Sequence, residues 1–149
     1  MKKVGKVCAL FTLDKEIKAP YRQTLLTLDC QGIHDDKHYG SMMERTVLIS
    51  STESYTLIKE KIGILIPYGY LGKNLLIDFN PCNLPLGTQL KIGDTLLEIM
   101  QNCTLYNHLS TLNKRIPKLL KDDRGIFAKV VQLGHIHQED TIFLLDTAS

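Results

Sequence analysis

The sequence lacks several features that would place it in a functional class at once. None of its four cysteines are spaced as Cys-x-x-Cys, which argues against a structural zinc site. No apolar run approaches the roughly 20 residues that a membrane-spanning helix needs. The lysine-containing N-terminus is followed by no long apolar stretch and no small-residue cleavage site, so we expect no signal peptide. These absences predict a cytoplasmic protein with no membrane partner, whose cysteines remain free thiols.

The chain also lacks a large excess of charge of one sign. The chain has 18 Lys and Arg against 16 Asp and Glu, which leaves a formal net charge of +2. Proteins that bind nucleic acid usually carry a clustered basic surface and a much larger excess of positive charge. We therefore expect no nucleic-acid partner.

Short apolar segments separated by turn residues make up most of the chain. Its 149 residues are 44% hydrophobic, which is enough for a single domain, residues 1–149, with a buried core. Residues 134–140 are expected to form a loop. Strands are predicted at 4–10, 23–28, 46–49, 75–79, 87–94, 95–100, 126–133 and 141–145. Such short strands without a βαβ rhythm predict a mainly β fold, a closed or nearly closed β-barrel of mixed strands with two or three inserted helices.

Two helices are indicated between these strands. Ser50 with Glu53 matches a capping box that begins the first helix, and Gly63 ends it. Its buried face is predicted from three apolar residues at helical spacing, Tyr55, Ile58 and Ile62. A second helical stretch spans 109–119, where Pro117 breaks or restarts the helix.

Five short motifs follow one another along the chain. They are Gly-Ile-His-Asp-Asp-Lys-His at 32–38, Arg-Thr-Val-Leu-Ile-Ser at 45–50, Gly-Lys-Asn-Leu at 72–75, a Leu-Gly-Thr to Ile-Gly-Asp hairpin at 86–94, and Arg-Gly-Ile-Phe-Ala at 124–128. In this order they resemble the motifs of the MOSC domain, the C-terminal domain of molybdenum cofactor sulfurases, here as a stand-alone small protein. The resemblance covers nearly the whole chain and implies a MOSC-like barrel.

Three positions depart from the family pattern. Asp35 stands where the family usually has glycine, and Lys73 stands where it usually has glutamate. The family thiol often lies just before an x-x-Leu, and that alignment places Tyr106 at the cysteine position. Cys103 then lies three residues upstream, where some members have a second cysteine. Either Cys103 or the Tyr106 position corresponds to the family thiol.

The resemblance implies a site that binds molybdenum cofactor or carries reactive sulfur. The predicted catalytic residue and soft molybdenum ligand is Cys103, because a thiolate matches both soft molybdenum and persulfide sulfur. The predicted cofactor-binding residues are Arg45, Asn74, Arg124, Asp36, His38 and Lys37. The cations among them suit the phosphate of a pyranopterin. Each also has a structural interpretation: solvated ion pairs for the cations, loop capping for Asp36 and His38, and a left-handed turn for Asn74.

Three functions remain open on the sequence. The first is a molybdenum-cofactor-binding protein or sulfur carrier supplied by a sulfur donor such as a cysteine desulfurase, because the chain has no pyridoxal phosphate motif of its own. The second is a molybdenum-dependent reductase of N-hydroxylated compounds, which needs a separate electron-donor reductase. The third is a non-catalytic small barrel that binds a ligand or a protein. Whether the protein is a sulfurtransferase, an oxidoreductase or no enzyme is left open.

Overall fold

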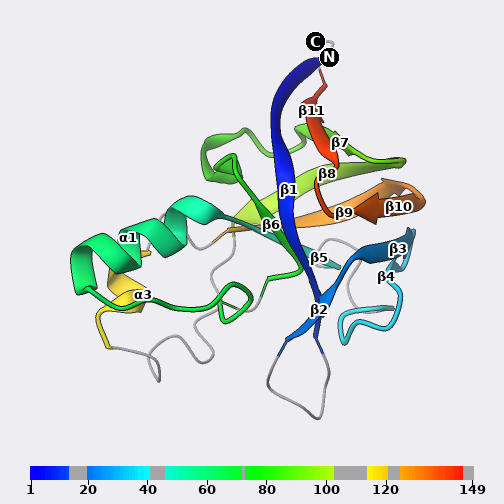
Figure 1. Ribbon diagram of the computed structural model, residues 1–149. Helices are drawn as coiled ribbons and strands as arrows, with labels where there is room; N and C mark the ends of the chain where they lie inside the picture. The colour runs from blue at the N-terminus through cyan, green and yellow to red at the C-terminus, as the bar shows by residue number, and fades with distance from the viewer. Residues whose placement is uncertain (14–19, 41–45, 72, 103–113, 121–124, 146–149) are drawn as a thin grey trace.

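Seven strands form a closed barrel in the computed structural model, which describes residues 1–13, 20–40, 46–71, 73–102, 114–120 and 125–145 (Figure 1). The neighbours around the ring are β1 (Lys2–Thr12), β11 (Thr141–Leu144), β7 (Gln89–Ile92), β8 (Thr95–Asn102), β9 (Ile126–Gln132), β5 (Val47–Ser51) and β6 (Leu75–Ile77). The ring closes because β11 pairs with both β7 and β1. β5 and β6 run parallel, and the other neighbours run antiparallel. The mainly β, mixed barrel predicted from the sequence is thereby confirmed.

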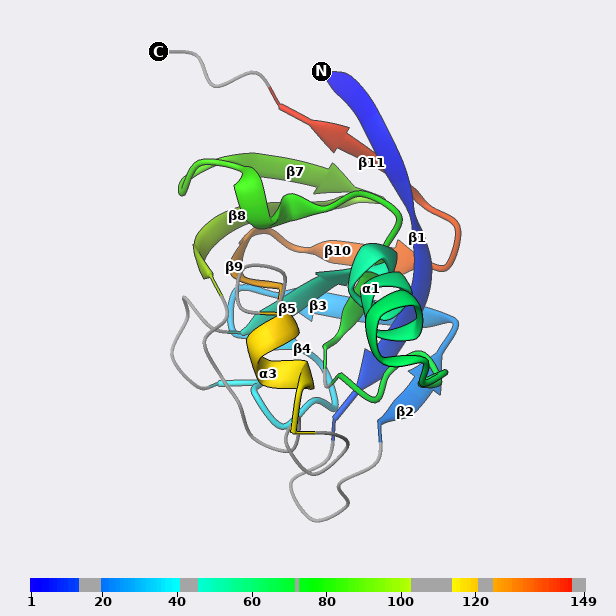
Figure 2. The same ribbon diagram turned by 90° about the vertical axis from the view of Figure 1, so that its left-hand side faces the viewer.

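The remaining described strands extend one side of this barrel. β2 (Tyr21–Gln23) pairs with the end of β1, and β10 (Gly134–His137), β3 (Leu25–Asp29) and β4 (Gly32–Ile33) form a separate three-stranded sheet. Figures 1 and 2 show this small sheet on the side of the barrel opposite the helices.

The prediction of a loop at 134–140 was wrong over its first half. Gly134 and Ile136 are buried and His135 and His137 are exposed, so the segment has the two-residue period of a strand. With one apolar side chain among four residues, the sequence signal is too weak to show this. The strand conformation of β10 is stabilised by pairing with β3, in which Ile136 lies opposite Leu26.

The core divides into an interior and an outer cluster. Alternation along β6 shows the division, because Leu75 and Ile77 belong to the barrel interior and Leu76 packs outward beneath the helices. The interior cluster consists of aliphatic side chains from ten strands of both sheets, for example Val7, Leu28, Ile33, Val47, Leu75, Leu90, Ile99, Ile126, Ile136 and Ile142. The outer cluster includes Tyr55, Ile58 and Ile116.

The two α-helices among the described residues pack on the outer face of the barrel, and a short 3₁₀ helix contacts the interior cluster through Cys82. The α-helices are α1 (Thr52–Ile62) and α3 (Ile116–Leu119), and the 3₁₀ helix is η2 (Pro81–Asn83). The predicted capping box at Ser50 was wrong by one residue, because β5 continues to Ser51, whose Oγ accepts the N–H of Glu53 at 2.9 Å. Gly63 ends α1 with φ of 80°, as predicted. Pro117 lies in the first turn of α3, where a missing N–H costs nothing.

None of the helices among the described residues is long and apolar enough to span a bilayer.

Candidate functional site

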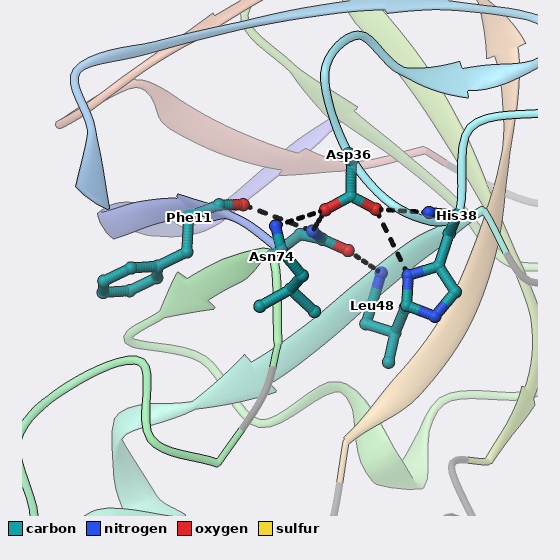
Figure 3. Close-up of polar contacts among 6 residues, drawn as sticks. Phe11, Asp36, His38, Leu48 and Asn74 are labelled. Carbon is teal, nitrogen blue, oxygen red and sulfur yellow. Dashed lines mark hydrogen bonds and ion pairs between the residues drawn. The ribbon is translucent and has the colours of Figure 1, made fainter. Parts of the chain in front are cut away.

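Asn74 joins two strands of the barrel just before β6 begins. Its main-chain N–H donates to Leu48 O of β5 at 2.9 Å, and its main-chain oxygen accepts from Phe11 N of β1 at 2.8 Å. The side chain repeats the same pattern, because Oδ1 accepts from Leu48 N at 3.0 Å and Nδ2 donates to Phe11 O at 3.2 Å. Asn74 therefore extends the sheet with its side chain as well as its backbone (Figure 3).

The second amide hydrogen of Asn74 goes to a buried carboxylate. Nδ2 donates to Asp36 Oδ1 at 2.9 Å. Since both hydrogens and the oxygen have protein partners and the residue is 0% exposed, the structure shows the Asn74 side chain holding strands and a loop together. The predicted left-handed turn conformation is not present, because Asn74 is not among the residues with positive φ.

Asp36 is the centre of this network. Its Oδ1 also accepts from Leu13 N at 2.7 Å, and its Oδ2 accepts from His38 N at 3.0 Å and faces His38 Nδ1 at 3.2 Å. Figure 3 shows the carboxylate between the Asn74 amide and the His38 ring. The loop at 32–38 is thereby fixed against the end of β1 and against Asn74.

The surroundings of Asp36 keep it ionised. Burial alone would raise the pKa of this carboxyl group, but the hydrogen bonds from His38 and from Leu13 N outweigh it, so the pKa of Asp36 lies below its ordinary value. The carboxylate side chain is 0% exposed, whereas the His38 ring keeps 22% of its surface exposed. Asp36 therefore positions the loop, and His38 is the member of the pair that reaches the surface.

Lys37 is half-buried between these two residues. Its main-chain N–H donates to Leu13 O at 2.7 Å, which adds a second tie between this loop and the end of β1. Asp35, two residues before Lys37, has φ of 67°. A left-handed conformation explains why the family usually has glycine here, and Asp is one of the few other residues that adopt it readily. This departure is therefore compatible with the local fold.

The loop before Asn74 is held by Tyr55, which the sequence predicted on the buried face of the first helix but not in contact with this loop. Tyr55 of α1 accepts the N–H of Gly69 at 2.9 Å and that of Leu71 at 3.5 Å through its hydroxyl oxygen. Burial raises the pKa of Tyr55 above its ordinary value, so the hydroxyl stays protonated. The helical spacing of Tyr55 predicts only that it is buried. It does not predict the hydrogen bond with Gly69, which lies 14 residues further along the chain.

Other predicted residues are not part of the described structure. Cys103, Arg45, Arg124 and Tyr106 lie outside the described residues, so their predicted roles remain predictions. Within the described ranges, no group of three His, Cys, Asp or Glu side chains is placed to hold a metal ion. The described part of the site therefore consists of the Asp36–Asn74 network, His38 and Lys37.

The sequence model of the MOSC domain matches residues 34–143. This range covers most of the chain and contains Asp36, His38 and Asn74. The chain belongs to the MOSC domain family. Its described site thus joins two parts of the MOSC domain, the polar loop after β4 and the segment before β6. No curated protein matches the sequence.

Solved structures share the fold at low sequence identity. YuaD from Bacillus subtilis superposes with a TM-score of 0.79 at 18% identity, over 93% of this chain and 93% of that one. YiiM from Escherichia coli has a TM-score of 0.71 at 16% identity, over 97% of this chain and 71% of that one. YiiM from Geobacillus stearothermophilus has a TM-score of 0.70 at 13% identity, over 97% and 75%. At these identities the likeness concerns the fold of this MOSC chain.

Proposed function

We propose that this MOSC protein binds molybdenum cofactor, carries sulfur on the Cys103 thiolate, or does both. The observation that supports it best is the 2.9 Å hydrogen bond between Asn74 and Asp36. It brings together two motifs that are 38 residues apart, and it holds the partly exposed His38 ring at their junction. An ionised, fully hydrogen-bonded carboxylate gives this junction a fixed geometry, which a binding site requires.

The residues present fit the polar part of the cofactor. The donors that we propose for this purpose are the partly exposed His38 ring and the ammonium group of its sequence neighbour Lys37, and both suit a phosphate or a polar pterin edge. Arg45 and Arg124 are proposed to add bidentate contacts to the phosphate. When bound, the cofactor supplies a soft molybdenum centre, for which the proposed protein ligand is Cys103.

Sulfur transfer requires one thiolate and a donor persulfide. The Cys103 thiolate attacks the outer sulfur of the donor persulfide, a new S–S bond forms on Cys103, and the donor leaves as a thiolate. The S–S bond of the donor breaks as the new one forms, and only the outer sulfur moves, so no external oxidant or reductant is needed. The chain supplies the nucleophile, and a separate cysteine desulfurase would supply the persulfide.

Copurification tests the proposal. Wild-type protein, Cys103→Ser and the control Cys30→Ser are purified from a host that makes the cofactor, and molybdenum and pterin are measured per protein. Cys30 is an exposed thiol in the described structure, so it is a matched control. We expect enrichment in the wild type and in Cys30→Ser, with a loss in Cys103→Ser.

A second assay addresses sulfur directly. The same proteins are treated with a small-molecule persulfide and examined by mass spectrometry for one added sulfur on the peptide that contains Cys103. The proposal fails if neither molybdenum and pterin nor added sulfur exceeds the level of Cys103→Ser. Transfer of electrons from a reductase to an N-hydroxylated base would instead indicate the reductase function.

A further inference from the structure

Lys73 is a buried cation with almost no partner. The residue is 6% exposed, and its Nζ donates one long hydrogen bond, to Leu71 O at 3.4 Å. An ammonium group has three hydrogens to donate, and buried charges are normally paired with an opposite charge. Among the described residues no carboxylate forms an ion pair with Lys73. Within the described part of the chain, the ammonium group of Lys73 therefore has no counter-charge.

The lysine side chain runs past Gly125, the residue before β9. A Cβ atom placed on Gly125 would be 3.3 Å from Lys73 Cε, and 3.3 Å from the carbonyl carbon of Ile49. The end of the Lys73 chain is thus close to the Ile49–Ser50 peptide of β5. The missing side chain of Gly125 leaves the space through which the lysine passes.

A second polar group near this point also lacks a partner. Ser50 Oγ is the buried side-chain oxygen or nitrogen without a hydrogen bond in the described part of the chain, and Ser50 is 1% exposed. The β5–β9 register pairs Leu48 with Phe127 and Ile49 with Ile126, so it places Ser50 opposite Gly125. Two unsatisfied donors, one charged and one neutral, therefore flank the same glycine.

We infer that Lys73 and Ser50 bind a tetrahedral oxoanion at the junction of β5, β6 and β9. Such an anion supplies the missing counter-charge for the ammonium and acceptor oxygens for both donors. Phosphate and molybdate share this chemistry. The glutamate that the family usually has in place of Lys73 would repel an anion, so the site depends on the lysine that this chain has there.

The anion has two possible sources, a free oxoanion or the phosphate group of the cofactor. The second source rests on the proposed function, and the first does not. The two are distinguished by titrating purified protein with inorganic phosphate or molybdate alone, and by measuring the pterin content of Lys73→Met from the cofactor-producing host.

The binding test uses isothermal titration calorimetry at constant ionic strength, with chloride as the control anion. Wild-type protein is compared with Lys73→Met, Ser50→Ala and the control Lys91→Met, whose lysine is exposed on β7. We expect saturable binding in the wild type and in Lys91→Met. Loss of the charged donor should weaken it about 10-fold or more, and loss of the hydroxyl should weaken it about 3-fold.

A measurement on wild-type protein covers the case in which Lys73→Met fails to fold. Phosphate that binds only the native state should raise the thermal unfolding midpoint, and Ser50→Ala should reduce that rise. The inference is overturned if neither anion binds saturably at millimolar concentration and Lys73→Met retains full pterin content. It is equally overturned if Lys73→Met binds both anions as the wild type does. Lys73-dependent anion binding without any copurified cofactor would support the inference while the proposed function fails.

Discussion

The side-chain amide of Asn74 donates a 2.9 Å hydrogen bond to the buried carboxylate of Asp36. The other amide hydrogen goes to Phe11 O, so no direction around this side chain is left to a ligand. The two motif residues act on each other, and their joint effect is to place His38 and Lys37. Asn74 is in this structure a positioning residue, and changes to it should affect stability first.

Asn74→Asp should be strongly destabilising at neutral pH. An added carboxylate would face Asp36 Oδ1 and Phe11 O, where the amide now donates both hydrogens. Two carboxylates in one site disfavour ionisation of both, and we expect a loss of about 3 kcal/mol or more. Urea unfolding at pH 7 and pH 4 measures it, and the loss should be smaller at pH 4, where the pair can share a proton.

The control for this change is Asn83→Asp, which alters an exposed asparagine in η2 by the same chemistry. It should change the free energy of unfolding by no more than about 0.5 kcal/mol. Equal effects of the two substitutions would contradict the role assigned to Asn74.

Stability should fall below pH 4 because of Asp36. The pKa of this group is lowered in the folded state, so its contribution is present above the unfolded value of about 4 and is lost as pH falls through the folded value. Urea midpoints measured from pH 7 down to pH 3 should decline more steeply in the wild type than in Asp36→Asn. The same comparison with Asp29→Asn is needed, because hydrogen bonds from Tyr39 and His34 also lower the pKa of Asp29. A wild-type slope unchanged by Asp36→Asn would refute this assignment.

Asp35 should be replaceable by glycine but not by a β-branched residue. Its φ of 67° is left-handed, which costs an L side chain about 1–2 kcal/mol and costs glycine almost nothing. Asp35→Val should therefore lower the free energy of unfolding by about that amount, and Asp35→Gly should not lower it. Thermal unfolding of both variants decides the point, and a stable Asp35→Val protein would show that the loop tolerates another conformation.

Gly125→Ala should be far more damaging than Gly87→Ala. Both glycines have positive φ, 108° and 88°, but a Cβ on Gly125 would lie in contact with Ile49 O and Lys73 Cε, whereas Gly87 has nothing within 4 Å. Gly87→Ala thus reports the backbone cost alone, about 1 kcal/mol. Gly125→Ala should cost about 2 kcal/mol more through overpacking. Chemical denaturation of the pair measures the difference, and similar losses would mean that no close contact exists at Gly125.

Strands with strong local signals could be predicted from the sequence. β5 is a run of β-branched and apolar residues, and β7 and β8 alternate around a Gly-Asp turn, so short-range preference and final structure agree. β10 could not be predicted, because it carries one apolar residue and owes its conformation to β3, more than a hundred residues earlier. The end of β5 at Ser51 could not be predicted either, because it depends on pairing with β6, in which Ser51 lies opposite Ile77.

The same distinction applies to the candidate site: the sequence identified some of its residues, and the tertiary structure decided what they do. The order of motifs was enough to point to the MOSC family, and Asp36, His38 and Asn74 could be named from it. Their roles were decided largely by packing. The hydrogen bonds that saturate Asn74 come from Phe11 and Leu48, and Leu13 joins the nearby His38 in keeping Asp36 ionised. The burial of Lys73 without a counter-charge among the described residues is visible only in three dimensions, since no local pattern shows that this charged side chain is buried.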